Sequence, residues 1–453
     1  MTVRRMIFAV LVLLLVMGPN GVRHLLRAAS RGKERECWFL VSFALRQVRP
    51  LPVDELARLA LVEAGDVRRL ALEYLGSFGA RARPVSMRLI PLLGSEDLPT
   101  RRETVYGLYL TDMCTLALEA AGPDAPKLLL EAVRTGSPRR AKAAVECLAL
   151  LNPPTSEAVS ELGRLAAGAG DRAVRLASLW SLRTLGRSAE AAAEALERAA
   201  GGSDVQFRIK AIVSLAAVTG RADAGVRRLT SELRSDDPKA RLAAAWYLGD
   251  FQADGAPAVG ALAAALSDEY WKVREWAAMS LGQIGPAAAP AVEPLSRLLL
   301  SRFESARAPA DQLAMDGPED TGTTQAEQAA ALNRLEASVR DRAAWALAKI
   351  GKPDGRVRGL LLSCLTDERP AVRAAGARAL GLQPAWAGAT VPKLIPLLKD
   401  PDDSVRGATY LAFWRLGPAA RQALEPLTQA MRREETRGNR ITASIAVEEA
   451  QGK

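Results

Sequence analysis

The chain has very little of the chemistry that enzymes and metal sites use. Its 453 residues include one histidine, His24, and four cysteines, Cys37, Cys114, Cys147 and Cys364. The cysteines show no C-x-x-C spacing and lie in helical patterns beside leucine or alanine, so we expect buried thiols and no metal site. A single histidine outside the repeats leaves no Ser-His-Asp triad or Cys-His pair, and no phosphate-binding glycine motif occurs. We therefore predict a non-enzymatic protein that carries no cofactor.

Aromatic residues are also scarce, and β-strand patterns are missing. Phe, Trp and Tyr make up 5% of the chain, whereas hydrophobic residues make up 49% and are rich in alanine and leucine. No stretch alternates apolar and polar residues as a half-buried strand would. The composition therefore excludes a sheet architecture and predicts an all-α body.

What the chain has instead is one helical unit that recurs along it. Residues 268–285, which read DEYWKVREWAAMSLGQIG, are a clear copy. At about 100° of turn per helical residue, Val273, Ala277 and Leu281 fall on one face of a short amphipathic helix. Gly285 is expected to end this helix, because glycine accepts the backbone conformation that follows a helical C-terminus.

An arginine marks each copy at intervals of 33 residues, and we call these the register arginines: Arg175, Arg208, Arg241, Arg274, Arg307, Arg340, Arg373 and Arg406. A small residue follows each at plus three: Ser178, Ala211, Ala244, Ala277, Ala310, Ala343, Gly376 and Thr409. Seven have a large apolar residue at plus seven: Leu182, Leu215, Leu248, Leu281, Leu347, Leu380 and Phe413. We expect the large residues to fill the core and the small ones to let helices approach closely.

Each repeat contains a second amphipathic stretch, for example 256–266, 288–300 or 390–398. Each repeat is therefore predicted to be two antiparallel helices that bury their apolar faces only by stacking on neighbouring repeats. The pattern is looser before residue 175, where Arg68 and Arg101 are again 33 apart. We predict about eleven repeats in all.

The repeated residues resemble a known family. The pattern D/E-x-x-V/A-R-x-x-A-x-x-x-L-G at 237–249 is similar to HEAT repeats of the phycobilisome-lyase-like kind. The resemblance covers nearly everything outside the two ends and implies a right-handed αα-superhelix whose second helices line a concave face. It also implies a ladder of charge pairs between repeats, which would join the register arginines to the acidic residues four positions before them: Asp171, Asp204, Asp237, Glu336 and Asp402.

The first 30 residues are expected to form a hydrophobic signal or anchor segment with basic flanks. Arg4 and Arg5 precede an apolar run at 6–17, which would rise about 18 Å as a helix and is too short for a bilayer core of about 30 Å. This is the length of a signal-peptide core. No A-x-A cleavage pattern follows, and a basic stretch comes next. We predict a membrane-associated or exported protein, with the side of the repeat domain left open.

Positive charge is concentrated in this same region. The net charge is +10, but residues 1–50 hold nine Lys and Arg against Glu34 and Glu36, which leaves +3 for the remaining 403 residues. A phosphate-binding protein needs a basic stripe on its binding face. Nucleic acid is therefore an unfavoured partner, and the basic cluster is better suited to a lipid surface.

One position of the repeat is predicted to face solvent. Plus five lies about 200° from plus three and about 160° from plus seven, so it should point away from the buried stripe. The candidate protein-binding residues at this position are Tyr106, Trp180, Trp246, Met279, Trp345 and Arg378. Such residues are typical of binding hot spots, but tryptophans here could equally tuck between neighbouring helices. Four of the other tryptophans, Trp271, Trp276, Trp386 and Trp414, are expected to pack in the core or between helices.

The repeat domain is predicted to span 31–433. Within it, 303–328 is rich in turn formers and acids and is read as a degenerate repeat with a loop. Residues 434–453 lose the period and are predicted to be an irregular or disordered tail.

Two classes of function remain open. The first is a non-enzymatic scaffold or adaptor that binds a protein or peptide on the concave face. The alternative is an accessory subunit of a lyase-type enzyme, or a HEAT-like protein that binds nucleic acid.

Overall fold

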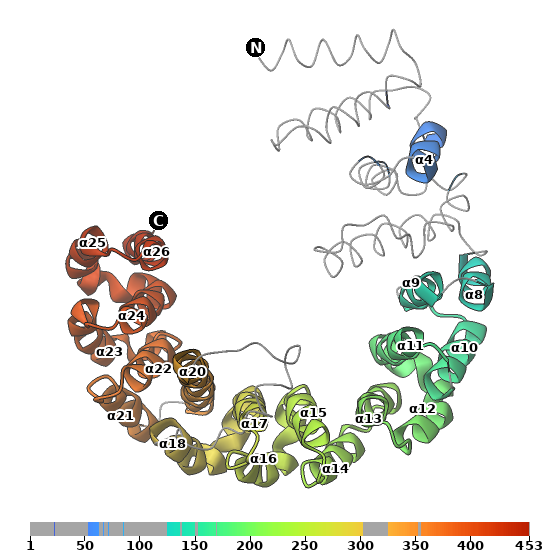
Figure 1. The fold of residues 1–453 in the computed structure, drawn as a ribbon, viewed down its shortest axis with the longest axis horizontal. Helices are drawn as coiled ribbons and strands as arrows, with labels where there is room; N and C mark the ends of the chain where they lie inside the picture. Colours follow the sequence, from blue (N-terminus) through green and yellow to red (C-terminus); the bar gives the residue numbers. More distant parts are fainter. Residues whose placement is uncertain are drawn as a thin grey trace. The chain divides into compact units, whose positions relative to one another are not determined.

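The computed structural model describes residues 22, 53–62, 67, 71, 85, 125–135, 138–149, 153–168, 170–301, 325–351 and 355–452. Every element in these ranges is an α-helix or a 3-10 helix, which confirms the all-α prediction (Figure 1). The chain divides into two compact units, Met1–Arg221 and Ala222–Lys453, which we call unit 1 and unit 2. The predicted N-terminal segment at 1–30 lies outside the described residues except for Val22.

Unit 1 contains a stack of helical pairs. Its described elements are α4 (Val53–Val62), α8 (Ala125–Thr135), α9 (Pro138–Leu148), α10 (Ser156–Ala167), α11 (Arg172–Leu185), η5 (Gly186–Ala192), α12 (Ala193–Ala200) and α13 (Val205–Thr219). Helices α9, α11 and α13 contact one another in sequence, and α8, α10 and α12 form a second layer beside them.

Unit 2 has the same two-layer organisation. Its inner layer consists of α15 (Pro238–Gly249), α17 (Trp271–Ile284), α20 (Gln325–Ile350), α22 (Pro370–Leu380), α24 (Asp403–Leu416) and α26 (Arg437–Gln451). Its outer layer consists of α14 (Ala222–Glu232), α16 (Val259–Ala265), α18 (Val292–Leu300), α21 (Gly355–Cys364), α23 (Ala387–Leu394) and α25 (Leu424–Arg433). Short 3-10 segments lead into several outer helices: η6 (Gln252–Ala258), η7 (Gly285–Ala291), η8 (Pro384–Trp386) and η10 (Gly417–Ala423), while η9 (Ile395–Lys399) continues α23. Figure 1 shows the inner layer on the inner side of this unit's curve.

The core follows the predicted repeat positions with one exception. Six of the seven large residues at plus seven are buried, and so are the small residues at plus three that the structure describes. The exception is α13, in which Leu215 is half-buried while Val213, predicted to face outward, is only 4% exposed. Because α13 carries large apolar residues on most of its circumference, the register arginine does not fix which face is buried.

The predicted charge ladder is wrong in its acidic partners. The carboxylates of Asp171, Asp204, Asp237 and Asp402 accept hydrogen bonds from backbone N–H groups at the start of the following helix. Four positions before the register arginine is the residue that precedes the helix, where free N–H groups need an acceptor. The fifth predicted acid, Glu336, does pair with its register arginine, at 3.6 Å from Arg340.

A ladder does exist, but its acids lie 27 or 28 residues after the arginine. The bidentate pairs are Arg241 with Asp268 at 2.7 and 3.1 Å, Arg373 with Asp400 at 2.8 Å, and Arg406 with Glu434 at 2.9 and 3.1 Å. In each case the remaining nitrogen, Nη1, donates to two carbonyl oxygens five and six residues earlier. The arginine therefore ties the turn before its own helix to the next repeat.

The region around the predicted degenerate repeat shows direct contact between flanking helices. Residues 302–324 are outside the described part of the chain, and α20 begins at Gln325. Helix α20 packs against both α17 and α18, and Arg340 donates to the carbonyl oxygens of Leu299 and Ser301. The inner layer thus passes directly from α17 to α20, and α20 forms a pair with α18.

The C-terminal segment is a regular helix, so the prediction of an irregular tail is wrong. Helix α26 packs on α24 and α25 and buries Ala443, Ala446, Val447 and Ala450. These residues are small, so the segment lacks the large apolar residues by which the other repeats are recognised in the sequence. The same small size allows α26 to lie close to α24.

Two local predictions, on a helix end and on buried thiols, are confirmed for the described residues. Gly285 ends α17 with a positive φ of 74°. Cys147 and Cys364 are buried thiols, and burial raises the pKa of Cys364 to about 12; Cys37 and Cys114 lie outside the described residues. No helix in the described ranges has the length and apolar character needed to cross a membrane.

Candidate protein-binding face

The predicted binding residues fall into different environments. Tyr106 lies outside the described residues. Trp180 is in α11 of unit 1 and is 46% exposed. The other four belong to the inner layer of unit 2: Trp246 on α15, Met279 on α17, Trp345 on α20 and Arg378 on α22. The candidate binding residues that the structure describes are therefore one exposed tryptophan in unit 1 and a row of four side chains on successive inner helices of unit 2.

An exposed aromatic stack lies at the α15 end of the inner layer. Trp246 is 47% exposed, and its ring stacks on that of Trp276 with centroids 4.6 Å apart and planes 9° apart. Tyr247 also lies nearly parallel to Trp246, at 5.8 Å. Trp276 was expected to pack between helices, and its ring does lie between α17 and α15. It covers only part of Trp246, which stays 47% exposed. The two indoles form a flat apolar platform that water still reaches.

Polar side chains of α17 and α20 contact one another next to the Trp246–Trp276 stack. Glu275 precedes Trp276 and accepts a hydrogen bond of 2.5 Å from the Ser338 hydroxyl. Its carboxylate also lies 3.5 Å from the Arg342 guanidinium. These contacts fix α20 against α17 beside the aromatic stack.

Trp345 has a structural role that Trp246 lacks. A Cβ atom on Gly282 of α17 would come within 2.7 Å of the Trp345 ring atom Cε3 and closer still to Cζ3. The indole therefore lies directly on the α17 backbone, and the Lys349 ammonium lies 5.9 Å from the ring centroid on the same helix. Met279, between the two tryptophans along the row, is partly exposed.

Arg378 is held by a carboxylate of the preceding inner helix. Its Nε and Nη2 donate to Oδ1 of Asp341 on α20 at 3.0 and 2.8 Å. Burial raises the pKa of Asp341, and the nearby Arg378 guanidinium opposes that shift. Arg415 on α24 donates to the carbonyl oxygen of Arg378 at 3.5 Å. Arg378 is thus a fixed cation and not a freely moving one.

The remaining tryptophans differ from one another. Trp386 is 5% exposed, as expected for a core residue, whereas Trp414 on α24 is 41% exposed and contradicts that expectation. Trp271 is partly buried, and its indole Nε1 has no hydrogen-bond partner. Trp414 lies next to Arg415 in sequence, so an exposed indole accompanies the guanidinium at the α24 end of the layer.

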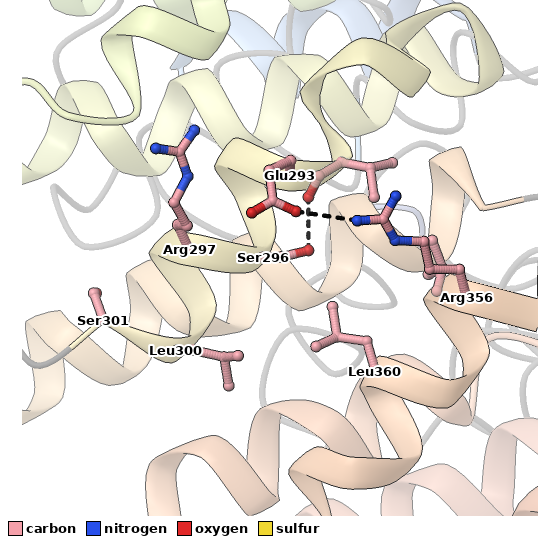
Figure 2. Close-up of a pocket in the computed structure, with 9 residues that line it drawn as sticks. Glu293, Ser296, Arg297, Leu300, Ser301, Arg356 and Leu360 are labelled. Carbon is pink, nitrogen blue, oxygen red and sulfur yellow. Dashed lines mark hydrogen bonds and ion pairs between the residues drawn. The ribbon is translucent and has the colours of Figure 1, made fainter.

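The outer layer contains a pocket of about 520 Å³ between α18 and α21 (Figure 2). Leu300, which is 39% exposed, and Leu360 contribute apolar surface, and Glu293 pairs with Arg356 at 3.4 Å across it. Elsewhere seven-residue segments such as η6, η7 and η10 precede an outer helix and pack on the previous one. Only four residues separate Ile350 from Gly355, too few for such a segment. The pocket thus occurs where the connection to the outer helix is three residues shorter than at η6, η7 and η10.

The part of the chain that the structure describes shows no metal centre. Within those ranges no three His, Cys, Asp or Glu side chains gather closely enough to hold a metal ion. The inner layer offers aromatic surface and fixed charges, which suit reversible binding of another macromolecule.

These features define a helical-repeat solenoid, and the comparisons identify the type of repeat. A family model described as HEAT repeats matches residues 226–313 and 359–448. The chain therefore contains HEAT repeats, as the sequence motif indicated, although the match does not distinguish the phycobilisome-lyase-like kind. No curated protein sequence matches the chain.

Solved structures of similar architecture have low identity to this chain. A chain from a structure of Kap95p with RanGDP is 15% identical with a TM-score of 0.44, over 87% of this chain and 60% of that one. A structure of Kap121p bound to Pho4p is 12% identical with a TM-score of 0.40, over 95% of this chain and 50% of the other. An engineered protein is 18% identical with a TM-score of 0.32, over 88% and 98%. This chain thus spans one half to three fifths of the two karyopherin chains.

Sequence reasoning found Trp246 but missed its partner. Trp276 is at plus two of its own repeat, 30 residues after Trp246, so a search at the 33-residue period does not connect them. Position plus two of one inner helix meets plus five of the preceding one. Two ion pairs also join adjacent inner helices, at other combinations of positions: Glu275 at plus one with Arg342 at plus two, and Asp341 at plus one with Arg378 at plus five.

Proposed function

We propose that the protein is a non-enzymatic scaffold or adaptor that binds a protein or peptide on the inner layer of unit 2. The observation that carries this proposal is the Trp246–Trp276 stack, which leaves Trp246 47% exposed. Exposed apolar surface is unfavourable by roughly 25 cal/mol for each Å², and a partner that covers it recovers that free energy. Tryptophan is also among the residues that contribute most to protein interfaces.

The scaffold proposal is tested by crosslinking in the native cells followed by mass spectrometry. We expect a defined partner whose crosslinks map to α15 and α17, and we expect Trp246→Ser with Trp276→Ser to remove it. The matched control is Leu300→Ser, which removes an exposed apolar side chain from the outer layer. Unchanged crosslinks in the tryptophan variant, with helical content preserved, would show that the stack only joins α15 to α17.

A salt titration separates a protein partner from nucleic acid. Binding to a DNA or RNA oligonucleotide should weaken by several powers of ten between about 50 and 200 mM salt if it depends on phosphate contacts. Binding through an aromatic platform should change little over that range. Tight, steeply salt-dependent oligonucleotide binding would favour the nucleic-acid alternative.

We also propose that the chain is membrane-associated or exported through residues 1–30. The support is the sequence of that segment, in which Arg4 and Arg5 precede an apolar run and further basic residues follow. Protease protection of a C-terminal tag in spheroplasts would show on which side of the membrane the repeats lie. A freely soluble cytoplasmic protein with an intact amino terminus would exclude both forms of this proposal.

The phycobilisome-lyase-like character of the repeats is likewise a proposal. Its support is the motif at 237–249, and it allows a role as an accessory subunit of a lyase-type enzyme. Copurification with such an enzyme, whose rate falls when this chain is removed, would favour that role over simple scaffolding.

A further inference from the structure

The inner layer of unit 2 contains a cluster of cations that its own carboxylates do not neutralise. Asp341 on α20 is held by Arg378 on α22, and the charges of Arg342 and Arg415 also act on it. One guanidinium group thus contacts this carboxylate, Arg415 on the next inner helix contacts the Arg378 backbone, and Arg342 lies one residue after Asp341 on α20. Each helix is fixed by stacking on the next, so the cluster is preorganised.

The wider charge balance of this surface is also positive. Among the six charged side chains described along this row, Arg342, Lys349, Arg378 and Arg415 are cations and Glu275 and Asp341 are carboxylates, which gives these six a net charge of +2. Partial burial and the nearby Arg378 lower the pKa of Arg415. An additional carboxylate beside Arg415 would therefore relieve repulsion between guanidinium groups that are already partly removed from water.

Exposed aromatic surface lies next to the cluster. Trp414, which precedes Arg415, is 41% exposed, and the partly exposed Trp345, on the same helix as Asp341 and Arg342, lies against Gly282 of α17. Carboxylate recognition by arginine and apolar contact with tryptophan can therefore occur together.

We propose that a protein partner crosses α20, α22 and α24 with an acidic segment whose carboxylates bind at the cluster formed by Arg342, Arg378 and Arg415. The proposal rests on the scaffold function and specifies the chemistry of the partner. Charge complementarity favours an acidic protein over nucleic acid, because Glu275 and Asp341 interrupt the cations and would repel a continuous phosphate backbone. Arg378 satisfies Asp341, so Arg415, Lys349 and the exposed part of Arg342 are the groups that remain to meet the partner.

The test uses a fluorescein-labelled octaglutamate peptide as probe and octalysine as its opposite, with the full chain at low ionic strength. We expect fluorescence anisotropy to report binding of octaglutamate only. Arg415→Gln combined with Lys349→Gln should weaken it by at least about threefold, since each exposed charge contributes modestly. Arg421→Gln, at an exposed position of η10, is the matched control and should leave binding within about twofold. Arg378 and Arg342 are left intact because each pairs with a carboxylate.

Equal weakening by the cluster variant and the Arg421 control would overturn the proposal, because it would show only nonspecific attraction to a basic chain. Tighter binding of an oligonucleotide of equal charge, with the same dependence on Arg415, would also overturn it. The scaffold function is judged separately: a crosslinked partner that is lost with the Trp246 and Trp276 variant but kept with the Arg415 and Lys349 variant would preserve the scaffold and exclude the acidic segment. Circular dichroism on each variant confirms that the helices remain.

Discussion

At the scale of single residues, the neighbouring repeat decides whether a tryptophan at plus five remains available for binding. Trp246 and Trp345 occupy the same repeat position, yet one is stacked on an indole and exposed while the other lies on the backbone of α17. The difference arises because Gly282 has no side chain and lets the Trp345 ring approach. Periodicity identifies the column, but it cannot show what the facing repeat places against each member.

The role of Gly282 predicts that Gly282→Ala destabilises the protein. A methyl group there would overlap the Trp345 ring and force it to move, at a cost of about 1 to 3 kcal/mol in the free energy of unfolding. Gly260→Ala in α16 is the matched control, because a Cβ atom there meets nothing within 4 Å; it should stabilise the helix by about 0.5 to 1 kcal/mol. Urea denaturation measures both, and a neutral Gly282 variant would mean that Trp345 is free to shift.

At the scale of helices, an aspartate that caps a helix and an aspartate that pairs with an arginine should respond differently to replacement by asparagine. Asp237 accepts from a backbone N–H at the start of α15, a role that asparagine can fill, so Asp237→Asn should be nearly neutral while Asp237→Ala costs about 1 kcal/mol. Asp268 forms the bidentate pair with Arg241, and both of those side chains are mostly buried. Asp268→Asn should therefore cost more than Asp237→Asn in thermal or urea unfolding. Equal costs would contradict the assignment of the ladder to Asp268.

Glu434, between α25 and α26, makes stability depend on pH. The Arg406 guanidinium, the Thr436 N–H and the Tyr410 hydroxyl all bind its carboxylate, and they lower its pKa from 4.5 to about 2. A carboxyl with a depressed folded pKa stabilises the fold above the unfolded pKa and loses that effect as the pH falls through the folded value. We expect Glu434→Gln to cost up to roughly 3 kcal/mol at pH 7 and progressively less from about pH 5 to pH 2. Glu435→Gln, at the adjacent exposed position, should show no such change.

The sequence predicts the repeating helical pairs and most of their buried positions, because the 33-residue register and the 3.6-residue helical period both follow from packing. It does not predict contacts that depend on the offset between repeats. Asp268 and Asp400 pair with an arginine of the preceding repeat, and Trp276 meets Trp246 in the same way. The sequence also did not predict helix α26, because its buried face consists of alanine and valine and lacks the leucines that mark the other repeats.

At the scale of the whole molecule, the continuity of each unit depends on which helices stack directly. In unit 2 the inner layer passes from α17 to α20, even though Arg307 keeps the 33-residue register between them in sequence. Equal spacing therefore does not guarantee that a segment contributes a helix between these two neighbours. Helix α20 contacts α18 as well as α17, so α18 and α20 form one pair of the solenoid.

This arrangement predicts that residues 303–322 can be removed without loss of the solenoid. Replacing them with a flexible Gly/Ser linker of about twelve residues should change the free energy of unfolding by no more than about 1 kcal/mol, because closure entropy depends weakly on loop length. The hydrogen bonds from Arg340 to Leu299 and Ser301 would remain. Urea denaturation and limited proteolysis measure the result. If the segment were instead a stacked repeat, its removal would uncover apolar faces of α17 and α20, cost several kcal/mol and make both helices sensitive to protease.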